Sequence, residues 1–400
     1  MSVNDIARTH PAADIRAMRL HRLLPLASLL AVACDRALPP ARTVAPDIRD
    51  AAAYEAVPSI TLEPVAPLCA DPLACLTPPR ADAVVGDDGD VLLLMASGRR
   101  AEVGRVRAGT DSAVRVGREG SGPGEYRIPG LLGFSPTGDA LILDIAARRT
   151  LRFSRDGATA ATALVTLPPA PLGGFGFVGG ELRILSTDLP KTPGDSLPVH
   201  VFALDSAAPS ARQLHTLALR QPAYALMAMR QPPGLSTPAD WFALRQDGSV
   251  VFAHGGELAV ELFDPAGALV RRIGFALVPR EPLERDIAEA SASRLRGFPP
   301  GEMRDAAARQ LTQGMATRMP LVTALVTMRD GEIWIRGTPD QLGEQVEWLV
   351  LSAAGEPRFR VRLAADDAVL GKHAGRYLVT RQDGEGSRYW WVRPPTGAPR

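Results

Sequence analysis

Residues 136–157 read PTGDALILDIAARRTLRFSRDG, a segment with two glycine turns. Gly138 precedes the apolar run ALIL, and the alternating run TLRF leads into a second turn at Gly157. Glycine supplies the positive φ that tight hairpins need, and runs of this kind supply the paired strands. The segment therefore predicts two linked β-hairpins.

The first of these turns recurs along the chain. Six copies join a turn glycine to a mostly apolar run: DDGDVLLL (87–94), PTGDALIL (136–143), VGGELRIL (178–185), QDGSVVFA (246–253), RDGEIWIR (329–336) and HAGRYLVT (373–380). In three copies a second hairpin turn follows, at Gly157, Gly267 and Gly355. Two linked hairpins make a four-stranded sheet with two apolar faces, which must be buried between neighbouring sheets. The repeat predicts an all-β fold, a six-bladed β-propeller of four-stranded antiparallel blades.

The turn spacing sets the boundaries of this propeller, which we place at residues 58–397. Its blades are expected to begin near residues 82, 128, 172, 240, 321 and 364. The segment SITLEPV (59–65) is expected to pair with SRYWWVRP (387–394) and close the ring. Residues 282–314, between blades four and five, contain two segments rich in Ala, Glu and Arg, which predict a short helical insertion. The insertion is either a lid over the tunnel or a surface feature without function.

A glycine-rich stretch, VGREGSGPGEYRIPG, precedes the second blade at residues 116–130. Phosphate-binding loops are also rich in glycine, but they connect a strand to a helix and contain Gly-Lys-Ser/Thr. This stretch contains no such triplet, and the residues after it alternate as a strand does. We therefore interpret it as the crossing from one blade to the next.

Residues 120–157 resemble one NHL-type repeat, of the kind found in bacterial six-bladed propeller proteins. The matching positions are Gly122, Gly124, Glu125, Tyr126, Pro129, Gly138, Asp144, Arg149, Phe153 and Gly157. The family's usual Asn before this arginine is absent, with Ala147 and Arg148 in its place. The resemblance covers one blade and implies the fold. Such propellers include binding scaffolds, lyases and hydrolases, so it does not imply an activity.

The N-terminus predicts export. Three arginines, Arg16, Arg19 and Arg22, precede the apolar run LLPLASLLAVA (23–33), which is too short to span a bilayer. We expect residues 1–34 to be a signal peptide, with translation starting at Met1 or at Met18.

The end of this signal resembles a bacterial lipobox, in which Cys34 would be lipidated and become the first mature residue. An ordinary signal peptidase would instead recognise Ala31-Val32-Ala33 and cut at the same bond. Residues 35–57, rich in Pro and Ala, are expected to form a tether to the membrane.

The charge balance limits the classes of binding partner, and the cysteines indicate the redox compartment. The chain has 45 basic and 44 acidic residues, so no net field attracts it to nucleic acid or anionic lipid. We expect a monomer that touches the membrane only through its lipid anchor. Cys69 and Cys75 are expected to form a disulfide in an oxidising compartment, the alternative being two free buried thiols.

Four residues are candidates for facing a ligand. Arg118, Glu125 and Arg127 cluster at a blade junction, and Asp144 ends an inner strand. Each has a structural alternative, namely an Arg–Glu pair that joins loops, or a carboxylate that caps the next turn.

From the histidines and the remaining motifs we predict no catalytic residue, no metal site and no cofactor. The four histidines beyond the leader show no metal-site spacing with each other or with a carboxylate: His200, His215, His254 and His373. The string GDSL (194–197) lies in a proline-flanked loop without a partner Asp-x-x-His, so Ser196 is interpreted as a loop residue.

The sequence thus predicts an exported, lipid-anchored, non-catalytic propeller that binds a small ligand or a protein partner at the cell envelope. The alternative is a propeller enzyme, a lactonase-like hydrolase or a lyase, with metal ligands gathered from several blades. An enzyme of that kind would place acidic or histidine side chains from three or more blades in the central tunnel. A scaffold would line the tunnel with small or apolar groups.

Overall fold

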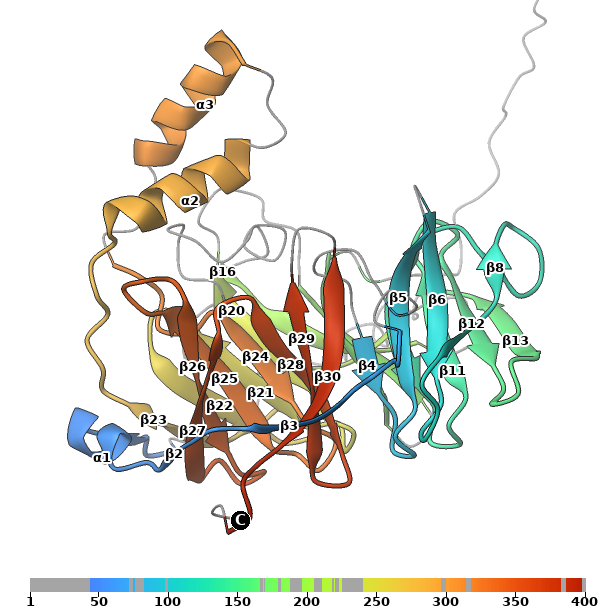
Figure 1. Ribbon diagram of the computed structural model, residues 1–400, viewed down its shortest axis with the longest axis horizontal. Helices are drawn as coiled ribbons and strands as arrows, with labels where there is room; N and C mark the ends of the chain where they lie inside the picture. The colour runs from blue at the N-terminus through green and yellow to red at the C-terminus, as the bar shows by residue number, and fades with distance from the viewer. Residues whose placement is uncertain are drawn as a thin grey trace, which may run out of the picture. The chain divides into compact units, whose positions relative to one another are not determined.

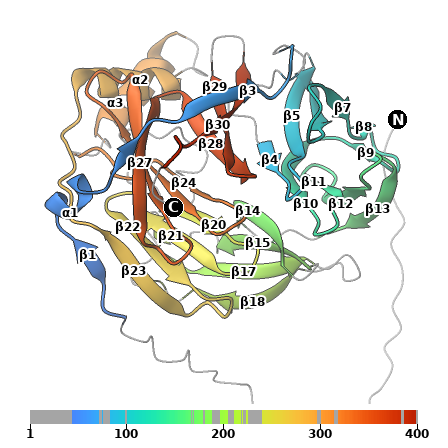
Figure 2. The same ribbon diagram turned by 60° about the horizontal axis from the view of Figure 1, so that its bottom comes forward.

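The computed structural model of the chain describes residues 44–397, except 72–74, 76–82, 98–99, 166–167, 169, 179–180, 188–195, 205–210, 218, 220–222, 225–239, 296–299, 314–317 and 383–385. These residues belong to one compact unit, Arg42–Arg400. Within it, six antiparallel sheets are arranged in a ring (Figures 1 and 2). The predicted six-bladed propeller is confirmed.

Each blade is formed by one sheet, and in the first five blades its four strands follow chain order from the innermost strand outward. Blade one contains β4 (Ala83–Val85), β5 (Val91–Ser97), β6 (Arg100–Val106) and β7 (Ala113–Arg115). Blade two contains β10 (Pro129–Phe134), β11 (Ala140–Asp144), β12 (Arg149–Phe153) and β13 (Thr159–Leu164). Blade three contains β14 (Ala170–Val178), β15 (Glu181–Thr187), β17 (Val199–Leu204) and β18 (Arg212–Thr216).

The second half of the ring has the same plan. Blade four contains β20 (Asp240–Leu244), β21 (Val250–His254), β22 (Leu258–Phe263) and β23 (Leu269–Phe275). Blade five contains β24 (Ala324–Thr327), β25 (Ile333–Pro339), β26 (Gln345–Leu351) and β27 (Pro357–Ala364). Blade six contains β28 (Asp367–His373), β29 (Arg376–Gln382), β30 (Ser387–Arg393) and, from the N-terminal part, β3 (Glu63–Pro67).

Two small sheets lie in the connections between the blade strands. The short strands β8 (Arg118–Glu119) and β9 (Glu125–Tyr126) pair in parallel within the glycine-rich stretch, and β16 (Ser196–Leu197) pairs with β19 (Ala223–Tyr224). The glycine-rich stretch therefore connects β7 of blade one to β10 of blade two, as expected.

Hydrophobic packing between blades holds the ring together. The buried residues that the structure describes form six clusters, and each lies between two neighbouring blades. Between blades five and six, Trp334 packs edge-on against Trp348 and Tyr377. Each sheet thus buries both apolar faces against its neighbours, as the repeat required.

The turn glycines have the backbone conformation that the hairpins need. Five of the six aligned glycines have φ between 73° and 86°, namely Gly89, Gly138, Gly248, Gly331 and Gly375. Gly180 lies outside the described residues. The second-hairpin glycines Gly157, Gly267 and Gly355 also have positive φ. These values confirm the turn assignment, because a side chain strains a backbone in this region.

Blade six closes the ring by joining the two ends of the chain. Strand β3 pairs antiparallel with β30, from Glu63 opposite Arg393 to Pro67 opposite Trp390. The predicted closure is therefore present, but it begins four residues later than expected. Residues 59 and 60 form β2 (Ser59–Ile60) and run parallel to β27 of blade five instead.

The predicted tether is wrong over residues 44–57, which lie against the propeller. Strand β1 (Asp47–Arg49) runs parallel to β23, and helix α1 (Ala51–Glu55) follows (Figure 2). The Tyr54 ring packs edge-on against Phe275, and Val57 is buried between blades four and five. A Pro- and Ala-rich composition did not reveal this, because β1 is short and its partners, β23 and Glu356, lie far away in the sequence. Residues 35–43 lie outside the described part of the chain.

The helical insertion between blades four and five is confirmed. Helices α2 (Glu284–Leu295) and α3 (Glu302–Gln313) contact each other and connect β23 to β24 (Figure 1). Because the strands of a blade alternate in direction, this connection lies at the end of the blades opposite the aligned glycine turns. None of the helices in the described part of the chain is long and apolar enough to cross a membrane.

Candidate functional site

The innermost strands enclose a cavity at the end of the ring where the aligned glycine turns lie. It has a volume of about 160 Å³ and is lined by residues from all six blades. The apolar lining includes Val85, Leu132, Phe134, Leu244, Met328 and Leu370. The charged residues in this lining are Arg245, Arg329 and Lys372, and no described acidic or histidine residue takes part. We call this cavity the tunnel mouth.

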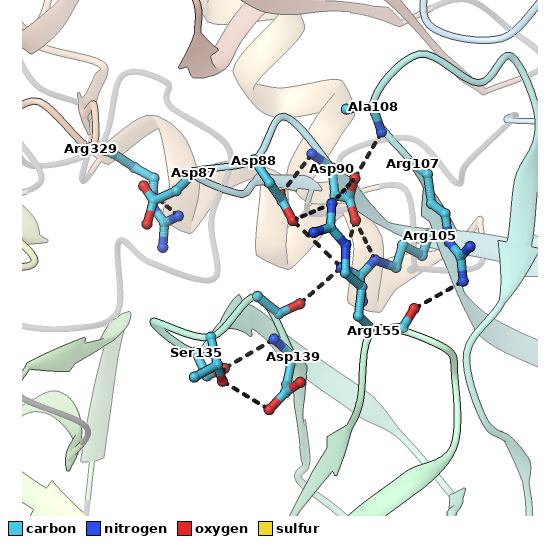
Figure 3. Close-up of polar contacts among 12 residues, drawn as sticks. Asp87, Asp88, Asp90, Arg105, Arg107, Ala108, Ser135, Asp139, Arg155 and Arg329 are labelled. Carbon is cyan, nitrogen blue, oxygen red and sulfur yellow. Dashed lines mark hydrogen bonds and ion pairs between the residues drawn. The ribbon is translucent and has the colours of Figure 1, made fainter.

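Arg329 links three blades at the tunnel mouth. It lies in the turn of blade five, and its Nη1 is 2.6 Å from Oδ1 of Asp87 in the turn of blade one (Figure 3). When the Gln246 amide of blade four is oriented with its oxygen toward the guanidinium, this oxygen accepts from Arg329 Nη2 at 2.7 Å. Burial lowers the pKa of Arg329, and nearby Asp87 only partly offsets this. The guanidinium nevertheless stays charged at neutral pH.

The other two cations have different partners. Arg245 Nη2 donates to the carbonyl oxygens of Gly331 and Ala353, each at 2.9 Å, and burial lowers its pKa. Lys372 Nζ lies 2.7 Å from Asp330 Oδ2 and 3.2 Å from Glu332 Oε2. The tunnel mouth therefore has positive side chains over apolar walls.

Sequence reasoning missed these residues, although the repeat contains the signal for them. Arg245 and Lys372 stand three positions before a turn glycine, and Gln246, Arg329 and Asp87 stand two positions before one. The aligned turns surround the tunnel mouth, so the residues two and three positions before each turn glycine are expected to lie at or beside it.

The candidates Arg118 and Glu125 meet at the junction of blades one and two. Glu125 accepts from Arg118 Nε at 2.8 Å and from the backbone N–H of Gly122 at 2.7 Å. These two hydrogen bonds lower the pKa of Glu125. The contacts match the loop-joining alternative, and neither residue lines the tunnel mouth.

The candidate Asp144 ends β11, the second strand of blade two. Its carboxylate accepts from the backbone N–H groups of Arg127, Ile128 and Ala147 at 2.8–3.2 Å. Burial raises its pKa, but these hydrogen bonds outweigh burial and the pKa is lowered. The side chain of the candidate Arg127 is exposed, and neither residue lines the tunnel mouth. Asp144 thus caps the backbone.

Instead of a phosphate, the glycine-rich stretch surrounds a side chain of this chain. Arg149 donates from Nη1 to Ser121 O at 3.0 Å and from Nη2 to Glu125 O at 2.6 Å. Tyr126 is fully buried, and its hydroxyl accepts from Val103 N–H at 2.9 Å. These contacts give a structural reason for the glycines and aromatic residue in this stretch.

The cysteines and histidines complete the predicted set. Cys69 and Cys75 are joined by a disulfide, with Cα atoms 6.1 Å apart, between blades six and one. Cys34 lies outside the described residues. The sequence did not indicate one contact of these histidines, in which His254 Nδ1 lies 2.6 Å from Asp240 Oδ1. That hydrogen bond raises the pKa of His254.

The hairpin register explains why this pair was missed. Asp240 and His254 are opposite residues of β20 and β21, a pairing that follows from the position of the Gly248 turn. They are far apart in sequence but adjacent in the sheet. Among the described residues, no three His, Cys, Asp or Glu side chains group as a metal site would require.

The DDGD turn (87–90) lies beside the tunnel mouth and joins blade one to blade two (Figure 3). Asp90 accepts from Arg105 Nε at 2.8 Å, and Asp88 lies 3.0 Å from Arg155 Nη2. Arg105 Nη2 also donates to Gly138 O at 2.8 Å. These acids therefore have arginine partners within the chain.

Comparison with solved structures shows the same fold. A DUF4221 family member from Bacteroides vulgatus matches with a TM-score of 0.50 at 9% identity, over 84% of this chain and 99% of that chain. A presumed exported protein from Bacteroides fragilis matches with a TM-score of 0.50 at 10% identity, over 85% and 99%. The likeness is one of fold alone. No family model and no curated protein sequence matches the chain.

Proposed function

We propose that this chain is a binding propeller that holds a small ligand in the tunnel mouth. The observation that carries the proposal is one cavity lined by all six blades, with apolar walls and cationic side chains. A metal-dependent hydrolase or lyase needs several carboxylate or imidazole ligands facing its cavity. The described lining offers none, which favours binding over the enzyme alternative.

Filling the cavity is expected to abolish ligand binding while keeping the fold. Gly176 lines the tunnel mouth from β14, and a Cβ built there lies 3.8 Å from Leu244 Cδ2, at ordinary contact distance. Gly176→Leu should therefore be accommodated without a clash at its Cβ and fill part of the cavity beside Leu244, within a strand, where leucine is tolerated better than glycine. A fragment library screened by thermal shift should yield compounds that stabilise the wild type and not this variant. A ligand at 100 times its Kd stabilises by about 2.7 kcal/mol.

Gly176→Ala is the matched control, because it adds one carbon and should weaken binding only partly. Compounds that stabilise the wild type and Gly176→Leu equally would place binding elsewhere. A library without any stabilising compound would count against a small-ligand site.

We further propose that the protein is exported and anchored to the cell envelope through a lipid on Cys34. Support comes from the basic residues, short apolar run and lipobox-like end of residues 1–34. The resemblance of residues 120–157 to an NHL-type repeat is compatible with this setting, since such repeats occur in bacterial propeller proteins.

Cys34→Ser is expected to move the protein from the membrane fraction to the soluble fraction. Cells fed a labelled fatty acid should incorporate label into the wild type and not into Cys34→Ser. Cys69→Ser serves as the control and should keep the label, because Cys69 lies within the propeller unit. A soluble, unlabelled wild type with Cys34 at its N-terminus would rule out the anchor and leave export intact.

A further inference from the structure

The charged side chains that face the tunnel mouth are of one sign, and the carboxylates that pair with them lie outside its lining. The lining side chains are all cationic, and the carboxylates, on Asp87, Asp330 and Glu332, pair with two of them. Arg245 Nε is buried and has no hydrogen-bond partner in the described part of the chain. Positive side chains over walls of low dielectric attract an anion.

Arg329 is held by groups that an anion can replace. Its carboxylate partner Asp87 has a side chain that is 62% exposed, and exposed ion pairs contribute little to stability. Its other partner, Gln246, is neutral. A ligand carboxylate offers the guanidinium the same acceptor as Asp87, and the planar fork of arginine binds carboxylates through two hydrogen bonds.

The apolar residues of the lining and the volume of the cavity determine what the ligand should be beyond its anionic group. The walls beneath the cations are formed by aliphatic side chains and Phe134, and the volume of about 160 Å³ is small for a ligand cavity. A chain of a few carbons would bury its surface here, whereas a nucleotide is too large. Inorganic phosphate would leave the apolar walls without a partner.

We propose that the ligand is a short-chain aliphatic carboxylate, whose carboxylate displaces Asp87 from Arg329 and whose chain enters the tunnel mouth. This inference rests on the proposed binding function and adds the chemical class of the ligand. Asp87 then competes with the ligand for the same guanidinium. The competition distinguishes this proposal from a simple latch between blades one and five.

The test measures Kd by isothermal titration calorimetry with hexanoate as the probe. Hexanamide is the neutral analogue of matched shape, hexylamine is a cation with the same number of carbons, and inorganic phosphate tests for anion binding without a chain. Hexanoate should bind at least tenfold more tightly than hexanamide. Arg329→Gln should weaken hexanoate binding at least tenfold, because it removes a charge-assisted pair. Asp87→Asn should strengthen hexanoate binding several-fold.

Arg152→Gln is the matched control. Arg152 pairs with Asp139 at 2.6 Å in blade two, is 44% exposed and does not line the cavity, so its loss should leave Kd unchanged. Opposite effects of Arg329→Gln and Asp87→Asn would support the proposal, and a folding defect cannot produce the gain in affinity.

Three outcomes would overturn it. If hexanoate binding is unchanged or weaker in Asp87→Asn, the Asp87–Arg329 pair only joins blades one and five and does not compete with the ligand. Hexanamide or hexylamine binding as tightly as hexanoate, and lost in Gly176→Leu, leaves the binding function in place and makes the carboxylate class wrong. If neither hexanoate nor shorter carboxylates down to acetate bind the wild type, while fragments do stabilise it, the ligand belongs to another class.

Discussion

Replacing Asp90 by Asn is expected to lower the free energy of unfolding by about 3–5 kcal/mol, because it deprives a buried arginine of its nearest counter-ion. The side chain of Asp90 is fully buried, and its carboxylate accepts from Arg105 Nε and from Ala108 N–H, each at 2.8 Å. The side chain of Arg105 is 4% exposed and also donates to Gly138 O. One guanidinium therefore joins blade one to blade two. Chemical or thermal unfolding followed by circular dichroism measures the loss.

Asp87→Asn is the matched control, since it makes the same change in the same turn. The Asp87 side chain is 62% exposed, so its ion pair should contribute less than about 1 kcal/mol. In the double variant Asp90→Asn/Arg105→Met, the loss should be smaller than the sum of the single losses, because the two groups interact. Equal losses for Asp87→Asn and Asp90→Asn would contradict a buried ion pair that stabilises the fold.

Deleting residues 387–400 is expected to open the ring and cause aggregation. The deletion removes β30, so β3 and β29 each lose a partner and expose strand edges that pair readily with other chains. It also removes Tyr389, which is buried between blades six and one. Size-exclusion chromatography with light scattering should show oligomers, and the melting temperature should fall sharply.

Two milder truncations serve as controls. Removing residues 394–400 leaves β30 intact, and replacing residues 282–314 by a short linker removes α2 and α3 without touching a blade. Both proteins should remain folded, with melting temperatures close to that of the wild type. If the 387–400 deletion behaves like these two, ring closure through β30 does not stabilise the protein.

The propeller could be predicted because its signal is local and repeated. A turn glycine with positive φ beside an apolar run is visible in six copies, and each copy specifies a hairpin by itself. The packing of β1 and β2 could not be predicted in the same way. These strands have two or three residues each and bind far along the chain to β23 and β27. The side-chain partners of β1, Arg271 and Glu356, are equally distant in the sequence.

The candidate site was less predictable than the fold. Arg118, Glu125 and Asp144 stand out because they are close in sequence to many glycines, but their contacts are with the loop itself. Arg329 stands in an ordinary turn, and its place in the site depends on Gln246 and Asp87 from two other blades. The alignment of the turns predicts which positions surround the tunnel, and only the three-dimensional arrangement shows which side chains meet there.

The way in which blade six is assembled also sets the order in which the protein can be completed. Strand β3 is among the first parts of the propeller to be synthesised, whereas its partner β30 is among the last. During synthesis β3 therefore remains without its partner β30 while five blades form, because pairing between distant segments comes late. A chain that stops before residue 387 cannot close. Closure of the ring thus requires that translation has passed residue 393.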